Sequence, residues 1–133
     1  FIETKSINEW KSPVLFDAIR AVVWLSQHSQ YKDSKDEKKI KKQFKDFFSI
    51  LKKMIRLGAD VKTLDSYGNS CLMCVVNTVE YYCIDCENKK IAKNLKKIFK
   101  LLIKSGANIH YSNKERRSIV EKCEDRPIAK CFM

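Results

Sequence analysis

The residues best suited to chemistry are six cysteines, four of which form two C-x2-C pairs. The pairs are Cys71 with Cys74 and Cys83 with Cys86. Two such pairs are typical of a four-thiolate zinc site when roughly 15–20 residues separate them. Here the separation is only eight residues, and one continuous helix over 71–86 would hold the pairs ~18 Å apart, too far to share a metal. We therefore favour ordinary buried or half-buried thiols, with no metal or other cofactor. The alternative is a zinc ion shared by all four thiolates, which a turn at Tyr81 and Tyr82 would allow.

The chain contains two histidines, His28 and His110, and neither lies in a motif for nucleophilic catalysis. No phosphate-binding glycine loop, dinucleotide fingerprint or nucleophile elbow is present. His110 follows a glycine turn, where we expect it to be exposed. We predict that the chain is not an enzyme and has no small-molecule substrate.

The composition suits one globular domain with a strong positive charge. The 133 residues carry a formal net charge of +11, mostly from lysine. This charge favours acidic partners or nucleic acid, but it equally fits a low-GC coding sequence, and specific phosphate recognition prefers arginine. No apolar run is long enough to span a membrane. Reduced cysteines indicate the cytosol or nucleus, and a start at Phe1 is compatible with a piece of a longer protein.

Periodic apolar residues predict an all-α fold. We expect a first helix from Pro13, capped by Ser12, and a polar break at 26–39. A second helix then runs to Leu57 and ends at Gly58. Its predicted buried side chains are Ile40, Phe44, Phe47, Phe48, Leu51, Met54 and Ile55. Further helices are expected after Ser70, from the end of an interruption at 81–90 to Ser105, and over 118–123.

The sequence repeats itself at a distance of 48 residues. The segments IRLGADVKTLDS (55–66) and IKSGANIHYSNK (103–114) align without a gap. Each follows a basic amphipathic helix and ends that helix with a glycine. Helical hairpins of this kind cannot bury their apolar faces alone, so a repeated hairpin predicts a stacked solenoid.

These segments resemble the ankyrin-repeat family. The family's helix end, L-L-L-x-x-G-A-D/N, is matched by LLIKSGANI (101–109), and its turn and first helix by DSYGNSCLMCVV (65–76). The resemblance implies an ankyrin-repeat solenoid of paired antiparallel helices with projecting turns, in one domain over 1–133. We expect about three divergent repeats, at 8–57, 58–105 and 106–133.

The chain departs from the family pattern in its turn chemistry and its repeat length. Cys71 stands where the family has proline, and Met73 where it has histidine. The repeat of 48 residues exceeds the family's unit of about 33. We place the surplus at 26–39 and 81–90, as longer helices or extra loops between paired helices.

The resemblance also implies a protein-binding function through turn tips and the concave face of the first helices. Transferred residue by residue, it nominates Lys62, Thr63, Leu64, Ser66, Tyr67, Asn69, Asn77, Thr78, His110, Tyr111, Ser112, Lys114 and Arg117. Tyr67 and Tyr111 are the expected anchors, because aromatic residues contribute disproportionately to interfaces. Divergent ankyrin proteins of viruses and intracellular bacteria suggest an effector acting on a host protein.

Two other functions remain open at this stage. Convex lysine stripes on the second helices could attract nucleic acid or an anionic surface. Their residues are Lys42, Lys45, Lys52, Arg56, Lys93, Lys97, Lys100 and Lys104. The chain could also be a regulatory module of a larger enzyme. Reversing charges on these stripes should abolish binding only if the lysines themselves bind nucleic acid or an anionic surface.

Overall fold

The structure consists of four α-helices with no β-strand in the part of the chain it describes. It is a computed structural model that describes residues 13–28, 34–111, 123 and 128. The helices are α1 (Val14–Leu25), α2 (Ser34–Arg56), α3 (Cys71–Tyr81) and α4 (Lys89–Lys104). The helix predicted over 118–123 lies outside the described residues except for Cys123, which is helical and buried.

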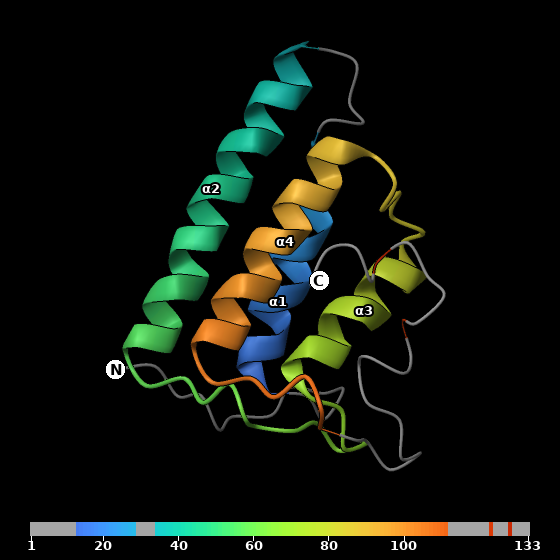
Figure 1. The fold of residues 1–133 in the computed structure, drawn as a ribbon. Coiled ribbons are helices and arrows are strands. Elements are labelled where there is room, and N and C mark those ends of the chain that lie inside the picture. Colours follow the sequence, from blue (N-terminus) through green and yellow to red (C-terminus); the bar gives the residue numbers. More distant parts are fainter. Residues whose placement is uncertain (1–12, 29–33, 112–122, 124–127, 129–133) are drawn as a thin grey trace.

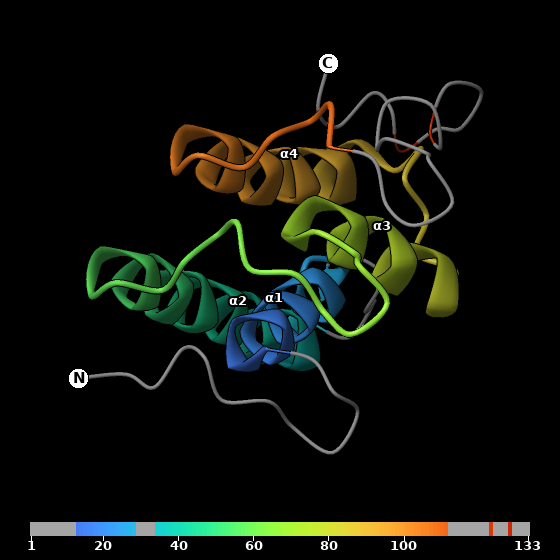
Figure 2. The ribbon, with the colours of Figure 1, turned by 90° about the horizontal axis from the view of Figure 1, so that it is seen from below.

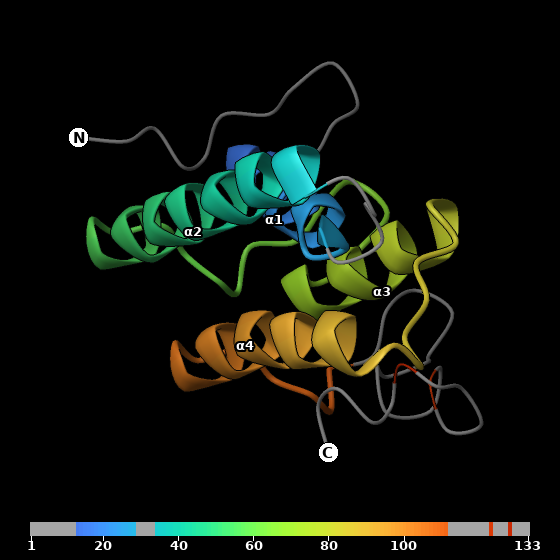
Figure 3. The ribbon, with the colours of Figure 1, turned by 90° about the horizontal axis from the view of Figure 1, so that it is seen from above.

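The helices alternate in direction, so that equivalent connections lie at one end of the molecule. α1 and α3 run one way and α2 and α4 the other, which places 57–70 and 105–111 together at the lower end in Figure 1. Views along the helices show α1 beside α3, with α2 and α4 flanking them on the same side (Figures 2 and 3). α1 packs against each of the other three helices.

The core is built around α1 and α3. Phe16, Ile19 and Val22 of α1 have no exposed surface. The apolar residues at helical spacing in the other two helices, which the sequence predicts to be buried, are all buried: Leu72, Val75, Val76 and Val79 in α3, and Ile91, Leu95, Ile98, Phe99 and Leu102 in α4. The prediction was wrong for Phe47 of α2: it shares the helical spacing of the buried Phe44 and Leu51, but it is 39% exposed because the neighbouring helices do not cover it.

The ends of α2 and α4 have the same backbone geometry. After α2, the Gly58 amide donates to the Ile55 carbonyl (3.1 Å) and the Ala59 amide to the Met54 carbonyl (2.9 Å). The equivalent bonds after α4 measure 3.0 Å each. This pair of bonds is a Schellman motif, in which the residue after the C-cap has a positive φ. Gly58 and Gly106 provide it with φ values of 113° and 112°.

The two turns that follow these glycines are also equivalent. The Asp60 carboxylate accepts from the Lys62 amide at 2.8 Å, and the Asn108 side chain accepts from the His110 amide at 2.9 Å. The two segments therefore share the hydrogen bonds of both the helix end and the turn that follows it, over 55–62 and 103–110.

Several predicted boundaries need correction. α1 begins at Val14 with Pro13 as its N-cap, so Pro13 is not the first helical residue, and Ser12 lies outside the described residues. α2 begins at Ser34, inside the predicted polar break, because polar residues at 34–39 can extend a solvated helix end. Part of the surplus length is therefore helix. The start of α3 is confirmed, since the Ser70 side chain caps it by accepting from the Met73 amide.

A buried polar contact ties α4 to the end of α1. The Asn94 amide donates to the Ser26 carbonyl at 2.9 Å and lies 3.0 Å from Nε2 of His28. Nε2 can accept this hydrogen bond only in a neutral imidazole. Burial, as the largest cause, and nearby lysines lower the pKa of His28 from its usual value. The contact therefore depends on a neutral His28.

Replacing Gly58 with alanine should destabilise the fold. A Cβ at this position would meet no atom within 4 Å, so the whole cost comes from the positive φ. We expect a loss of about 1–2 kcal/mol in the free energy of unfolding in urea. Arg56→Ala, at an exposed helical position, should change it by about 0.5 kcal/mol or less. Equal stability of Gly58→Ala and wild type would contradict the assigned turn.

The stability of the fold should fall as the pH drops through about 6.5, the usual pKa of histidine. The unfolded chain then binds a proton at His28 that the folded chain resists, so the equilibrium shifts towards unfolding. Urea midpoints between about pH 5.5 and 7.5 measure this effect. In His28→Gln, whose side chain does not titrate, the urea midpoint should depend less on pH. An unchanged pH dependence would exclude His28 as the cause of the loss of stability.

Candidate functional site

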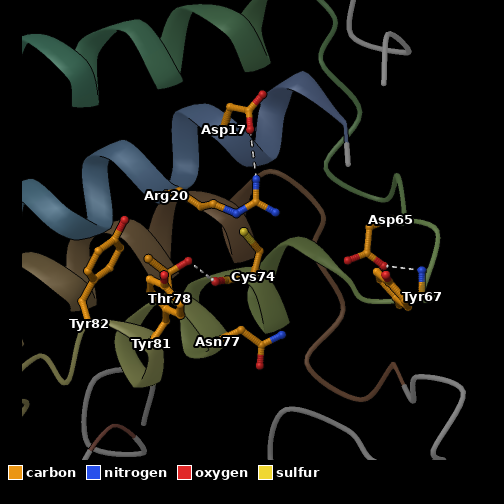
Figure 4. A pocket seen from close by; sticks show the side chains of 9 residues that line it. All are labelled: Asp17, Arg20, Asp65, Tyr67, Cys74, Asn77, Thr78, Tyr81 and Tyr82. Carbon is orange, nitrogen blue, oxygen red and sulfur yellow. Dashed lines mark hydrogen bonds and ion pairs between the residues drawn. The ribbon is translucent and has the colours of Figure 1, made fainter. Parts of the chain in front are cut away.

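The first candidate site is a pocket of about 510 Å³ formed by α1, α3 and the 65–67 turn. We call it the tyrosine pocket. It is lined by Asp17, Arg20, Asp65, Tyr67, Cys74, Asn77, Thr78, Tyr81 and Tyr82 (Figure 4). Its lining residues come from α1, the 65–67 turn, α3 and the residue that follows α3, and none comes from α2 or α4. A partner bound in this pocket would therefore use a surface separate from those two helices.

Three tyrosines dominate its rim. Tyr67 and Tyr81 are 70% and 80% exposed, and Tyr82 is 47% exposed. The rings of Tyr81 and Tyr82 pack edge to face with their centroids 5.0 Å apart. Figure 4 shows this pair at one end of the pocket and Tyr67 at the other. Several large aromatic side chains exposed around one pocket are typical of an interaction surface.

The turn that carries Tyr67 is held by the carboxylate of Asp65. Oδ1 of Asp65 accepts from the amides of Tyr67 (2.9 Å) and Asn69 (2.8 Å), and Oδ2 accepts from Nδ2 of Asn69 at 3.2 Å. Gly68 completes the turn with a φ of 78° and donates to the Asp65 carbonyl. Because these bonds fix the backbone, the Tyr67 side chain is presented from a preorganised support.

The floor of the pocket is closed by internal contacts. The Thr78 hydroxyl donates to the Cys74 carbonyl at 2.7 Å, and the Cys74 thiol lies 3.8 Å from the Phe16 carbonyl. On the α1 wall, Arg20 pairs with Asp17 at 3.0 Å. This pair is partly exposed, so it contributes little stability and remains accessible to a ligand.

The structure places the predicted partner-binding residues in different settings. Tyr67, Asn77 and Thr78 line the pocket, although Thr78 is buried. Tyr111 is half-buried and donates its hydroxyl to the Gly68 carbonyl at 3.1 Å, so it bridges the two turns. The remaining described members lie in the turns but outside the pocket lining: Lys62, Thr63, Leu64, Ser66, Asn69 and His110. Ser112, Lys114 and Arg117 lie outside the described residues.

Sequence reasoning missed Asp17, Arg20, Asp65, Tyr81 and Tyr82, and considered Cys74 only as a possible zinc ligand. Tyr81 and Tyr82 fall at the end of α3, in a stretch interpreted as an interruption between helices. Two adjacent tyrosines at a helix end were a usable signal, because tyrosine is enriched in interfaces. Asp17 and Arg20 are three residues apart, which places them on one face of α1.

The second candidate site is a groove of about 610 Å³ between α2 and α4. We call it the lysine groove. It is lined by Phe44, Lys45, Phe48, Ser49, Lys52, Lys97, Lys100, Leu101 and Lys104. The helices thus bring together five residues of the predicted basic face. Lys42, Arg56 and Lys93 are exposed on the same helices but do not line the groove.

The cysteines of the two C-x2-C pairs differ in exposure. α3 ends at Tyr81, so the turn that a zinc site requires is present, and Cys83 follows it with a φ of 50°. Cys71 and Cys74 are buried in α3, while Cys83 is exposed. In the described ranges no cluster of three or more potential ligand side chains is close enough to hold a metal ion.

None of the helices in the described residues is both long enough and apolar enough to cross a bilayer.

The exposed Cys83 should react with iodoacetamide before Cys71 and Cys74 do. Burial raises the pKa of Cys71 and of Cys74 to about 12, which lowers their thiolate fraction about a thousandfold. Tandem mass spectrometry after timed labelling measures the order, because Cys71, Cys74 and Cys83 lie in one tryptic peptide (63–89) and the label must be located by fragmentation. In urea the buried thiols should react as well. Native labelling of Cys74 as fast as Cys83 would contradict the packing of α3.

No protein-family model matches the chain, and no curated protein resembles it significantly.

Proposed function

We propose that this chain is an ankyrin-like protein-binding module that receives a segment of another protein in the tyrosine pocket. The observation that carries the proposal is the placement of three exposed tyrosines around one pocket. Tyrosine is favoured in interfaces because it supplies a large contact area and a hydrogen-bonding hydroxyl at a low cost in side-chain entropy.

The repeated turns support the ankyrin-like part of the proposal. The turns after Gly58 and Gly106 share their hydrogen bonds, and the helices alternate in direction as paired hairpins do (Figure 1). In that family the first helices and the turn tips contact partners. The tyrosine pocket is built from these parts here, namely α1, α3 and the turn that carries Tyr67.

The shape of the pocket favours an extended segment over a compact ligand. Tyr67 lies at one end and the pair Tyr81–Tyr82 at the other, so a bound chain would contact both ends while crossing Asn77 (Figure 4). Asp17, Arg20 and Asp65 provide charged groups of both signs along the wall. A polar peptide with an apolar or aromatic side chain towards each end fits this arrangement.

Selection of peptides on the immobilised domain tests the proposal. A phage-displayed library of random peptides about 12 residues long should yield binders, whose affinity is then measured by fluorescence anisotropy. We expect Tyr67→Ala and Tyr81→Ala each to weaken binding at least about tenfold, as loss of an aromatic anchor does. Both side chains are largely exposed, so neither change should affect folding.

Two control variants make the test specific. Leu64→Ala alters an exposed residue of the same turn outside the pocket, and Lys97→Glu alters the lysine groove. Both should retain affinity within about twofold. Failure to select any binder, or loss of binding in Leu64→Ala but not in the tyrosine variants, would overturn the pocket as the binding site.

A further inference from the structure

We infer that the lysine groove is a second interaction surface, which binds an acidic amphipathic segment of a partner protein. This surface lies on α2 and α4, whereas the tyrosine pocket lies on α1 and α3. The inference does not depend on the proposed function of the tyrosine pocket, because no residue lines both sites.

The walls of the groove carry a concentrated positive charge. Lys45 and Lys52 come from α2, and three further lysines come from α4. None of the nine lining residues is acidic, and the sequence of α4 contains no aspartate or glutamate. Five like charges facing one groove repel one another, so an anionic occupant relieves repulsion as well as adding attraction. Charge complementarity therefore selects an acidic partner.

The floor of the groove is apolar, which restricts the partner further. The rings of Phe44 and Phe48 stack with centroids 5.9 Å apart, and half-buried Leu101 faces them from α4. The ammonium group of Lys52 lies 4.9 Å from the centre of the Phe48 ring. A partner that carries only negative charge would leave this floor unused. An apolar side chain inserted between the lysines would bury the surface that Phe48 and Leu101 leave exposed.

The same floor argues against nucleic acid as the occupant. Proteins that bind single strands stack bases on exposed aromatic rings. Here Phe44 is only 4% exposed, and Phe48 is half-buried beneath Lys52. The cationic residues are all lysines, which lack the planar fork that engages phosphate oxygens in pairs.

The length of the groove sets the size of the occupant. The lining residues extend from Phe44 to Lys52 along α2 and from Lys97 to Lys104 along α4. At 1.5 Å per residue, these stretches span roughly 11–12 Å, about two helical turns. An amphipathic helix of at least two turns, with one apolar face between acidic flanks, matches this length.

Binding of synthetic peptides tests the inference. The probe is a fluorescein-labelled peptide of about 12 residues with leucines on one helical face and glutamates beside them. The comparison peptide has serine in place of each leucine and keeps the same charge. We expect fluorescence anisotropy to show binding of the leucine peptide, with at least about tenfold weaker binding of the serine peptide. Binding should also weaken as salt increases.

Matched charge reversals locate the binding. Lys97→Glu with Lys100→Glu alters the groove, whereas Lys42→Glu with Lys93→Glu makes the same change in net charge outside it. All four lysines are exposed, so folding should be retained. We expect the groove pair to weaken binding of the leucine peptide at least about tenfold and the outer pair less than about threefold. Tyr67→Ala should leave it unchanged.

Three results would overturn the inference. The first is equal weakening by the two lysine pairs, which would mean attraction by net charge alone. The second is an oligothymidylate of about 12 nucleotides binding as tightly as the leucine peptide, which would make nucleic acid the occupant. The third is failure of the leucine peptide to bind at low salt.

Discussion

The burial of α1 is the constraint on which the rest of the structure depends. α1 contacts each of the other three helices, and Phe16, Ile19 and Val22 have no exposed surface. Each such side chain contributes about 1.5–3 kcal/mol when it leaves water. A helix buried on this scale fixes the positions of its neighbours. α3 packs on one side of α1 and α2 on another. The distances between the helices that line each candidate site therefore depend on how they pack against α1.

The two sites differ in chemistry although the same core supports them. α1 contributes Asp17 and Arg20 to the tyrosine pocket, where charges of both signs lie among aromatic rings. The lysine groove has positive charge only, over a floor of phenylalanine and leucine. The net charge of +11 is therefore not distributed evenly over the molecule. The two proposals together describe a protein that holds two different segments at once.

Features set by local sequence could be predicted. The glycines at helix ends, the Ser70 cap and the apolar stripe of α4 follow from backbone geometry and helical period, and the structure confirms them. Features set by tertiary packing could not. Phe47 has the same character as Phe44 and Phe48, and only the position of the neighbouring helices leaves it exposed. The contact of Asn94 with His28 joins residues 66 positions apart, beyond any local pattern.

The candidate sites divide in the same way. The basic face was predictable because lysines recur at helical spacing, and the structure adds that five of them share a groove with an apolar floor. The tyrosine pocket was predicted only at Tyr67, Asn77 and Thr78. Its other members come from α1, from the turn before Tyr67, from Cys74 inside α3 and from the end of α3, and single-sequence reasoning cannot place these segments beside one another.

Mapping of amide chemical shifts tests the central claim most directly. The isotope-labelled domain is titrated with a peptide selected for binding to it, and shifts are followed residue by residue. The account predicts the largest changes in three segments from different elements: 17–20 of α1, the turn at 65–67, and 77–82 at the end of α3. Changes concentrated in α2 and α4, with these three segments unaffected, would contradict it.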